Sequence, residues 1–160
     1  ALILIEYWNK PLQFIDIDQT TSNFYAILNN RTDIKVIVDL PIGNLISYRY
    51  PQARAEDLDA HYLLWATVLH DKILLNGYTG FLPKAYYERG AYLSVNFPTG
   101  EKLVKLREWG VDGIVVHKNE FNEEGDFDRM RMELVAKGVP ELALTSDRAL
   151  FDLTAWSGVP

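Results

Sequence analysis

Residues 111–117 read VDGIVVH, and residues 35–40 read KVIVDL. Both are short apolar runs rich in β-branched side chains, which favour extended backbone. Near-continuous apolar runs of this kind are typical of parallel strands whose two faces are both covered, because an exposed face would bring in alternating polar residues. We therefore expect Lys35–Leu40 and Val111–His117 to be central, mostly buried strands of one sheet.

Start and stop signals for helices lie on both sides of residues 111–117. Thr99 is placed to cap a helix that Gly110 ends. Gly125 or Asp126 opens the next helix, which Gly138 ends. The apolar residues expected on the inward faces are Leu103, Leu106 and Trp109 in the first helix and Phe127, Met130 and Leu134 in the second.

The signals earlier in the chain are shorter. Thr21 or Ser22 is placed to cap a short helix. Residues 57–69 show helical spacing, and Ile73–Leu75 has the pattern of a short strand. The residues expected to share a face are Phe24, Ile27 and Leu28 in the first helix and Tyr62, Trp65, Ala66 and Leu69 in the second.

Two further strands are expected near the end of the chain. Leu142–Leu144 and Ala149–Leu153 are joined by a turn at residues 146–148, which indicates an antiparallel hairpin at the edge of the sheet. The alternation of strands and helices before it indicates an α/β fold. We predict one layered domain over residues 1–160, with a mainly parallel sheet flanked by helices and a C-terminal antiparallel hairpin.

The composition, 48% hydrophobic and 24% charged, is that of a globular protein. With a formal net charge of -6, we expect no nucleic-acid partner, because phosphate binding needs a basic surface. The absence of Cys excludes disulfides and thiolate chemistry. The opening Ala-Leu-Ile-Leu-Ile has no initiator Met and no basic region, so we expect a piece of a longer protein, beginning with either a first strand or the last turn of a membrane helix.

Most motifs of known chemistry are missing from the sequence. The GYTG turn at residues 77–80 follows a predicted strand but lacks the Lys of a phosphate loop, so a tight turn is favoured over a nucleotide site. His61, His70 and His117 have no second ligand at a metal-binding spacing, and we predict neither a metal site nor a cofactor. No serine lies in a G-x-S-x-G turn, and we predict no catalytic residue.

Asp39 and His117 each lie at the end of a predicted buried strand. An acid at the carboxyl edge of a parallel sheet is often functional, but it also caps helices or shapes turns, which we favour for Asp39. His117 has two interpretations as well. It is a base or a ligand contact, or it is a hydrogen-bonding anchor between strand and loop, which is the commoner case.

The densest group of polar and aromatic side chains lies in residues 59–83, DAHYLLWATVLHDKILLNGYTGFLP. Aromatic rings beside amides, hydroxyls and imidazoles suit a sugar-like ligand, and they also suit a packed core with a sharp turn. Core packing is favoured for Trp65, whereas the rings beside the glycine turn are harder to bury completely. The predicted ligand-binding residues are His61, Tyr62, His70, Asn76, Tyr78, Thr79, Phe81 and His117.

A wider pattern includes this segment. It consists of Pro41, Arg54–Tyr62, Trp65, His70, Asn76–Pro83, Phe97–Pro98, Leu106, Gly110–Val111 and Ile114–His117. It resembles the C-terminal soluble region of bacterial polytopic membrane proteins related to lipid-phosphosugar-dependent glycosyltransferases of the protein-mannosyltransferase type. Those proteins carry N-G-Y-S-G-F-x-P and G-V-x-Y-V-V-V-H, so Thr79 replaces a Ser here and Gly113 an aromatic residue. The resemblance begins at about Lys35.

The resemblance implies a non-catalytic accessory domain on the extracytoplasmic face of the bacterial cell membrane. Its implied partners are the membrane-embedded part of the parent chain and a glycan or lipid-linked sugar. It carries over no catalytic residue, because the catalytic acid of that superfamily lies in a loop between membrane helices. Two alternatives stay open: a structural or protein-interaction domain of the same parent, and a free-standing small-molecule α/β enzyme.

Overall fold

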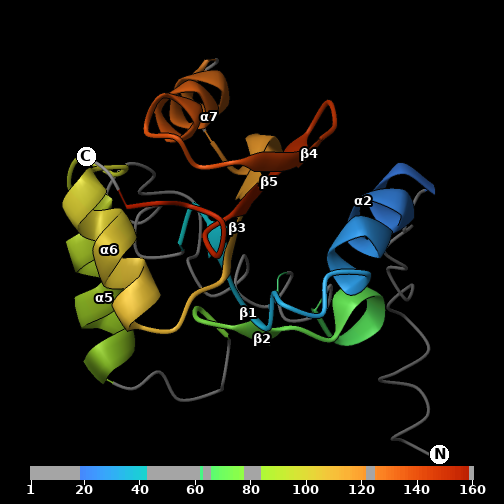
Figure 1. Ribbon diagram of the computed structural model, residues 1–160, viewed down its shortest axis with the longest axis horizontal. Coiled ribbons are helices and arrows are strands. Elements are labelled where there is room, and N and C mark those ends of the chain that lie inside the picture. Colours follow the sequence, from blue (N-terminus) through green and yellow to red (C-terminus); the bar gives the residue numbers. More distant parts are fainter. Residues whose placement is uncertain (1–18, 43–61, 63–65, 78–83, 122–124, 159–160) are drawn as a thin grey trace, which may run out of the picture.

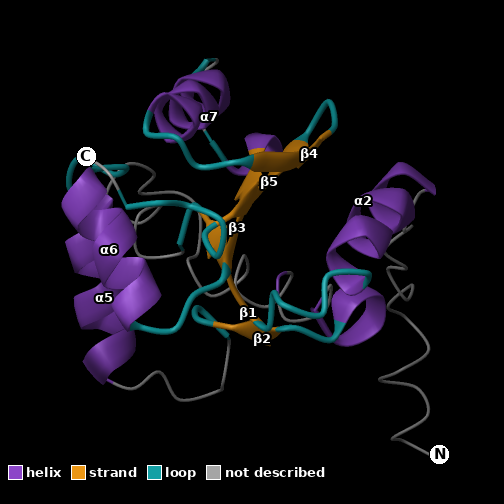
Figure 2. Ribbon diagram, in the orientation of Figure 1, coloured by secondary structure: helices purple, strands orange, loops and turns teal. Residues whose placement is uncertain are grey.

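The computed structural model of the chain describes residues 19–42, 62, 66–77, 84–121 and 125–158 (Figure 1). These residues build one sheet with helices on both sides (Figure 2). In chain order the elements are helix α2 (Gln19–Asn29), strand β1 (Val36–Leu40), the π-helical turn η1 (Ala66–His70), β2 (Ile73–Leu74), α5 (Lys84–Ser94), α6 (Gly100–Glu108), β3 (Gly113–His117), the 3-10 turn η2 (Lys118–Glu120), α7 (Asp126–Ala136), β4 (Glu141–Leu144) and β5 (Arg148–Asp152).

The five strands lie in the order β2-β1-β3-β5-β4. β1 is parallel to both β2 and β3, whereas β5 is antiparallel to both β3 and β4. The predicted α/β fold and its C-terminal antiparallel hairpin are therefore confirmed. The sheet is mixed rather than mainly parallel, because β5 inserts between β3 and β4 and forms an antiparallel ladder on each of its sides.

The two strands expected at the centre of the sheet are central and buried. Every residue of β3 is buried, and so are the last four residues of β1. Because side chains alternate between the faces of a strand, each strand contributes to two cores. Val38 and Leu40 of β1 point to one face of the sheet, and Ile37 points to the other.

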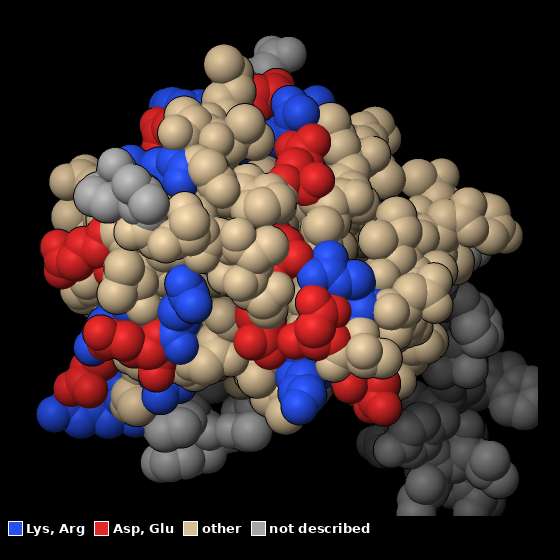
Figure 3. All heavy atoms as spheres, in the orientation of Figure 1, with Lys and Arg blue, Asp and Glu red and all other residues tan. Residues whose placement is uncertain are grey.

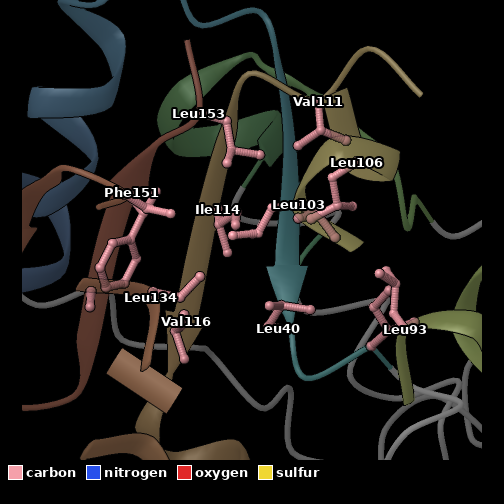
Figure 4. Close-up of a cluster of buried hydrophobic side chains, with 14 of the residues drawn as sticks. Leu40, Leu93, Leu103, Leu106, Val111, Ile114, Val116, Leu134, Phe151 and Leu153 are labelled. Atoms are coloured by element: carbon pink, nitrogen blue, oxygen red, sulfur yellow. The ribbon is translucent and has the colours of Figure 1, made fainter. Parts of the chain in front are cut away.

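The larger core lies on the face covered by α5 and α6 (Figure 1), and α7 contributes to it as well. Strand side chains such as Ile114 and Val116 meet helix side chains such as Leu103 and Leu106 there (Figure 4). The smaller core lies on the opposite face, beneath α2. It consists of Phe24, Tyr25, Leu28, Ile34, Ile37, Val115 and Leu150.

Helix signals in the second half of the sequence are confirmed. Thr99 caps α6, and its hydroxyl oxygen accepts a hydrogen bond from the backbone N–H of Lys102 at 3.3 Å. Gly110 and Gly138 follow α6 and α7 with φ of 81° and 74°, a left-handed conformation that glycine adopts at little cost. The antiparallel turn is also found, with Thr145 N–H bonded to Arg148 C=O at 2.8 Å.

The helices differ from the expectations in two respects. Thr21 and Ser22 do not cap the first helix but lie inside α2, where the buried stripe is Thr21, Phe24, Tyr25 and Leu28, and Ile27 is exposed. Helix α5 has no counterpart in the expected elements, because its sequence KAYYERGAYLS contains a glycine and no capping signal was recognised. In the part of the chain that the structure describes, no helix has the length and hydrophobicity needed to cross a membrane.

Candidate functional site

Asp39 and His117 meet at the edge of the sheet where β1 and β3 end. His117 Nε2 lies 2.7 Å from Asp39 Oδ1, and the two side chains are 3% and 1% exposed. Strand alternation produces this pair, because Asp39 points to the same face as Ile37, and His117 to the same face as Val115. The sequence singled out both residues but not their partnership. Asp39 is bound to an imidazole, rather than forming the helix cap or turn that the sequence favoured.

Asn76 lies beside Asp39, in the turn that follows β2. Its amide oxygen accepts a hydrogen bond from Asp39 N–H at 3.1 Å, and its amide nitrogen donates to Asp39 C=O at 3.0 Å. The side chain is buried, at 1% exposure. Asn76 thus holds the backbone of the residue whose carboxylate holds His117.

Tyr62 covers the ring of His117. The two rings are stacked, with centroids 4.7 Å apart and planes inclined by 24°. The Tyr62 hydroxyl donates to the backbone carbonyl of Pro41 at 3.2 Å, just beyond the end of β1. Asp39 thus holds one edge of the imidazole and Tyr62 covers one of its faces, and both contacts orient the ring of His117.

His70 ends η1 and stacks on Tyr25 of α2, with ring centroids 5.0 Å apart. Its Nδ1 accepts a hydrogen bond from the backbone N–H of Lys72 at 3.2 Å, so the neutral ring carries its proton on Nε2. Burial lowers the pKa of His70 from 6.5 to about 4, against the opposing effect of the Asp39 carboxylate. His70 is therefore a neutral group within the electrostatic reach of Asp39.

We call Asp39, Tyr62, His70, Asn76 and His117 the carboxyl-edge cluster. Four of its members, all except Asp39, are predicted ligand-binding residues that the structure brings together from separate segments. The other predicted ligand-binding residues lie outside the described part of the chain: His61, Tyr78, Thr79 and Phe81. The same holds for Trp65.

Arg148 borders the cluster and was missed by the sequence analysis. It pairs with His117 in the β3–β5 ladder. Its Nη1 donates to Thr21 Oγ1 at 2.7 Å and lies 3.1 Å from Asp147 Oδ2. Its guanidinium group is 5.9 Å from the ring centre of Tyr25. The available signal was a charged residue next to an apolar strand, but residue 148 was expected in the turn at residues 146–148.

Tyr25 links the cluster to α2. Burial raises the pKa of its hydroxyl well above the ordinary value, and the Asp39 charge raises it further. Arg148 acts in the opposite direction. The phenol therefore stays neutral at any physiological pH, and its ring serves as a stacking surface for His70.

The arrangement has definite chemical capabilities. A buried carboxylate bound to an imidazole can position the ring, fix its tautomer and exchange a proton with it. Among the residues that the structure describes, no group of three or more His, Cys, Asp or Glu side chains is placed to hold a metal ion. Comparisons of the chain with protein-family models, with curated proteins and with solved structures find no match.

Proposed function

We propose that this chain is a non-catalytic binding domain and that a hydroxyl-rich ligand, such as an acceptor glycan, binds beside the carboxyl-edge cluster. The observation that carries the proposal is the meeting of the Asp39–His117 pair with the Tyr62 ring where the parallel strands end. Open α/β sheets bind ligands outside the carboxyl ends of their strands. Aromatic faces beside a few fixed polar groups suit a sugar.

The proposed setting is a glycosyltransferase-like membrane protein, with this domain on the extracytoplasmic face of the bacterial cell membrane. The motif order from about Lys35 onward supports this setting, and the Asn76–Pro83 segment is its most specific part. The proposed partners are the membrane-embedded part of the parent chain and a glycan or lipid-linked sugar. On the face drawn in Figure 3, basic and acidic side chains are interspersed, a distribution unlike the contiguous basic surface that a nucleic acid needs.

A second candidate function is that of a structural or protein-interaction domain of the same parent. Specific hydrogen bonds favour it. Asn76 directs both ends of its amide at the backbone of Asp39, and Tyr62 directs its hydroxyl at Pro41 C=O. Polar groups engaged in this way hold the fold together, and a ligand that competed for them would have to replace buried hydrogen bonds.

Binding separates the two candidates. Calorimetry follows the titration of the chain with soluble oligosaccharides of mannose and of glucose. The variants Tyr78→Ala and Tyr87→Ala are titrated in the same way. The first removes a ring of the predicted site, and the second removes a tyrosine on α5 that is 50% exposed. Saturable binding that Tyr78→Ala weakens and Tyr87→Ala leaves unchanged supports the glycan proposal. Binding of neither sugar, with a loss of stability in Tyr78→Ala as large as for a core ring, supports the structural candidate.

The absence of catalysis is tested separately. The chain is incubated with lipid-phosphosugar donors and with model glycosides, and we expect no turnover above background. The Asp39–His117 pair is the acid–base pair of the cluster whose side chains are in direct contact, so Asp39→Asn and His117→Gln are the decisive variants. Turnover by the wild-type chain that either substitution abolishes would reject the non-catalytic proposal in favour of an α/β enzyme.

A further inference from the structure

Two buried polar atoms of the carboxyl-edge cluster have no hydrogen-bond partner among the described residues. They are Asp39 Oδ2 and His70 Nε2. The two residues are 1% and 2% exposed, so neither atom is satisfied by bulk solvent. Because an unsatisfied polar atom in a protein interior is costly, nearly all such atoms meet a partner in the native state.

The two atoms have opposite hydrogen-bonding character. Lys72 N–H bonds to Nδ1 of His70, so the Nε2 atom of the neutral ring carries the proton and donates. The other carboxylate oxygen of Asp39 binds His117, which leaves Oδ2 as an acceptor. One atom requires an acceptor, the other requires a donor, and they do not bond to each other.

Both atoms belong to the same region of the interior. The Asp39 carboxylate acts electrostatically on His70 and on Tyr25, the ring against which His70 stacks. His70 and Tyr25 come from η1 and α2, which pack together on the sheet face that carries Asp39. A group that bonded to both unsatisfied atoms would therefore lie between these segments and the sheet.

We propose that one O–H group bridges Asp39 and His70. Its oxygen accepts the hydrogen bond of His70 Nε2–H, and its hydrogen is donated to Asp39 Oδ2. A single atom that both accepts and donates is the oxygen of water or of an alcohol, whereas a carboxylate only accepts and an ammonium group only donates. The O–H group comes either from an internal water molecule or from a sugar hydroxyl, and the second source rests on the proposed function.

The tautomer of His70 is measured first. Long-range proton–nitrogen correlation spectra of the uniformly labelled chain at neutral pH report which ring nitrogen of each histidine carries a proton. We expect His70 in the Nε2–H form, with a slowly exchanging ring proton whose signal disappears in His70→Asn. An Nδ1–H tautomer of His70 overturns the proposal, because Nε2 would then be an acceptor.

The source of the O–H group is measured next, by magnetisation transfer from His70 Nε2–H to water and by titration with free mannose or glucose. Magnetisation transfer with a long-lived water molecule, unchanged when sugar is added, supports a bridge made by water. This result counts against the glycan proposal but not against the bridge. A saturable shift with sugar, lost in Asp39→Asn, supports the bridge by a ligand hydroxyl. A ring proton that contacts neither water nor sugar overturns the bridge, while calorimetric sugar binding still decides the function. If Asp39→Asn does not fold, weaker calorimetric binding of the sugar by His70→Asn than by the wild type takes its place.

Discussion

Asn76 binds Asp39 as a neighbouring strand would. Its amide oxygen and nitrogen lie 3.1 and 3.0 Å from the backbone nitrogen and oxygen of Asp39. The regular β1–β2 ladder stops just before this point, with Leu75 N–H donating to Ile37 C=O at 2.8 Å. The side chain of Asn76 thus extends a two-residue strand by one more pair of hydrogen bonds. It satisfies the backbone of the residue that carries the buried carboxylate.

Replacing Asn76 with Ala should destabilise the protein by about 1–3 kcal/mol, because a buried N–H and C=O of Asp39 lose their partners. The free energy of unfolding from urea denaturation measures the effect. Asn23→Ala is the matched control. Asn23 is exposed on α2, and its amide oxygen accepts a hydrogen bond from the exposed Gln19 side chain at 2.8 Å. It should change stability by less than about 0.5 kcal/mol. Equal effects in the two variants would contradict the backbone role of Asn76.

The Asp39–His117 pair should show a large coupling energy. A double-mutant cycle with Asp39→Ala and His117→Ala should give roughly 1.5–3 kcal/mol, the range for a hydrogen bond to a charged group. The pair Lys84–Glu88 of α5 is the control, since its side chains are 89% and 62% exposed. That pair should give about 0.3–0.5 kcal/mol. A coupling for Asp39–His117 as small as this would show that the buried contact does not hold the edge together.

The parts of the fold that follow from local signals could be predicted from the sequence. KVIVDL and VDGIVVH specify buried strands through composition alone, and Thr99 and Gly110 delimit α6 through their own backbone preferences. The position of β5 could not be predicted. Its insertion between β3 and β4 depends on how Leu150 and Phe151 pack on the two faces of the sheet, which is a property of the assembled core.

The candidate site was predictable as a set of residues but not as a set of contacts. Asp39 and His117 are 78 positions apart, and their contact depends on the register of β1 against β3. A shift of that register by one residue would place them on opposite faces. Arg148 was missed for a related reason, since a strand that starts one residue earlier than expected moves it from a turn onto the face of the cluster.

Tyr62 offers a test that separates its ring from its hydroxyl. Tyr62→Phe removes the hydrogen bond to Pro41 C=O and keeps the stack on His117, so it should cost roughly 0.5–1.5 kcal/mol. Tyr62→Ala removes a fully buried ring as well and should cost about 3–5 kcal/mol. Thermal and urea unfolding measure both. A Phe variant as unstable as the Ala variant would assign the stabilisation to the hydroxyl rather than to the stack.

Acid should weaken the fold through His70. Burial is the main cause that lowers its pKa to about 4, and Lys72 and His117 lower it further, whereas Asp39 and Asp71 act against them. The geometry supplies a second cost. Because Nε2 already carries a proton, a second proton must go to Nδ1, the atom that accepts the hydrogen bond from Lys72 N–H. Protonation would therefore turn a hydrogen bond into two donors facing each other.

The sign of the pH dependence follows from the lowered pKa. In the unfolded chain His70 titrates near 6.5 and in the folded chain near 4, so the unfolded state binds more protons between these values and stability falls as the pH drops. His70→Asn keeps an acceptor near the position of Nδ1 and does not titrate. Between about pH 7 and about pH 4.5, the wild type should lose about 2 kcal/mol more unfolding free energy than this variant. Equal losses in the two proteins would place the acid sensitivity in another group.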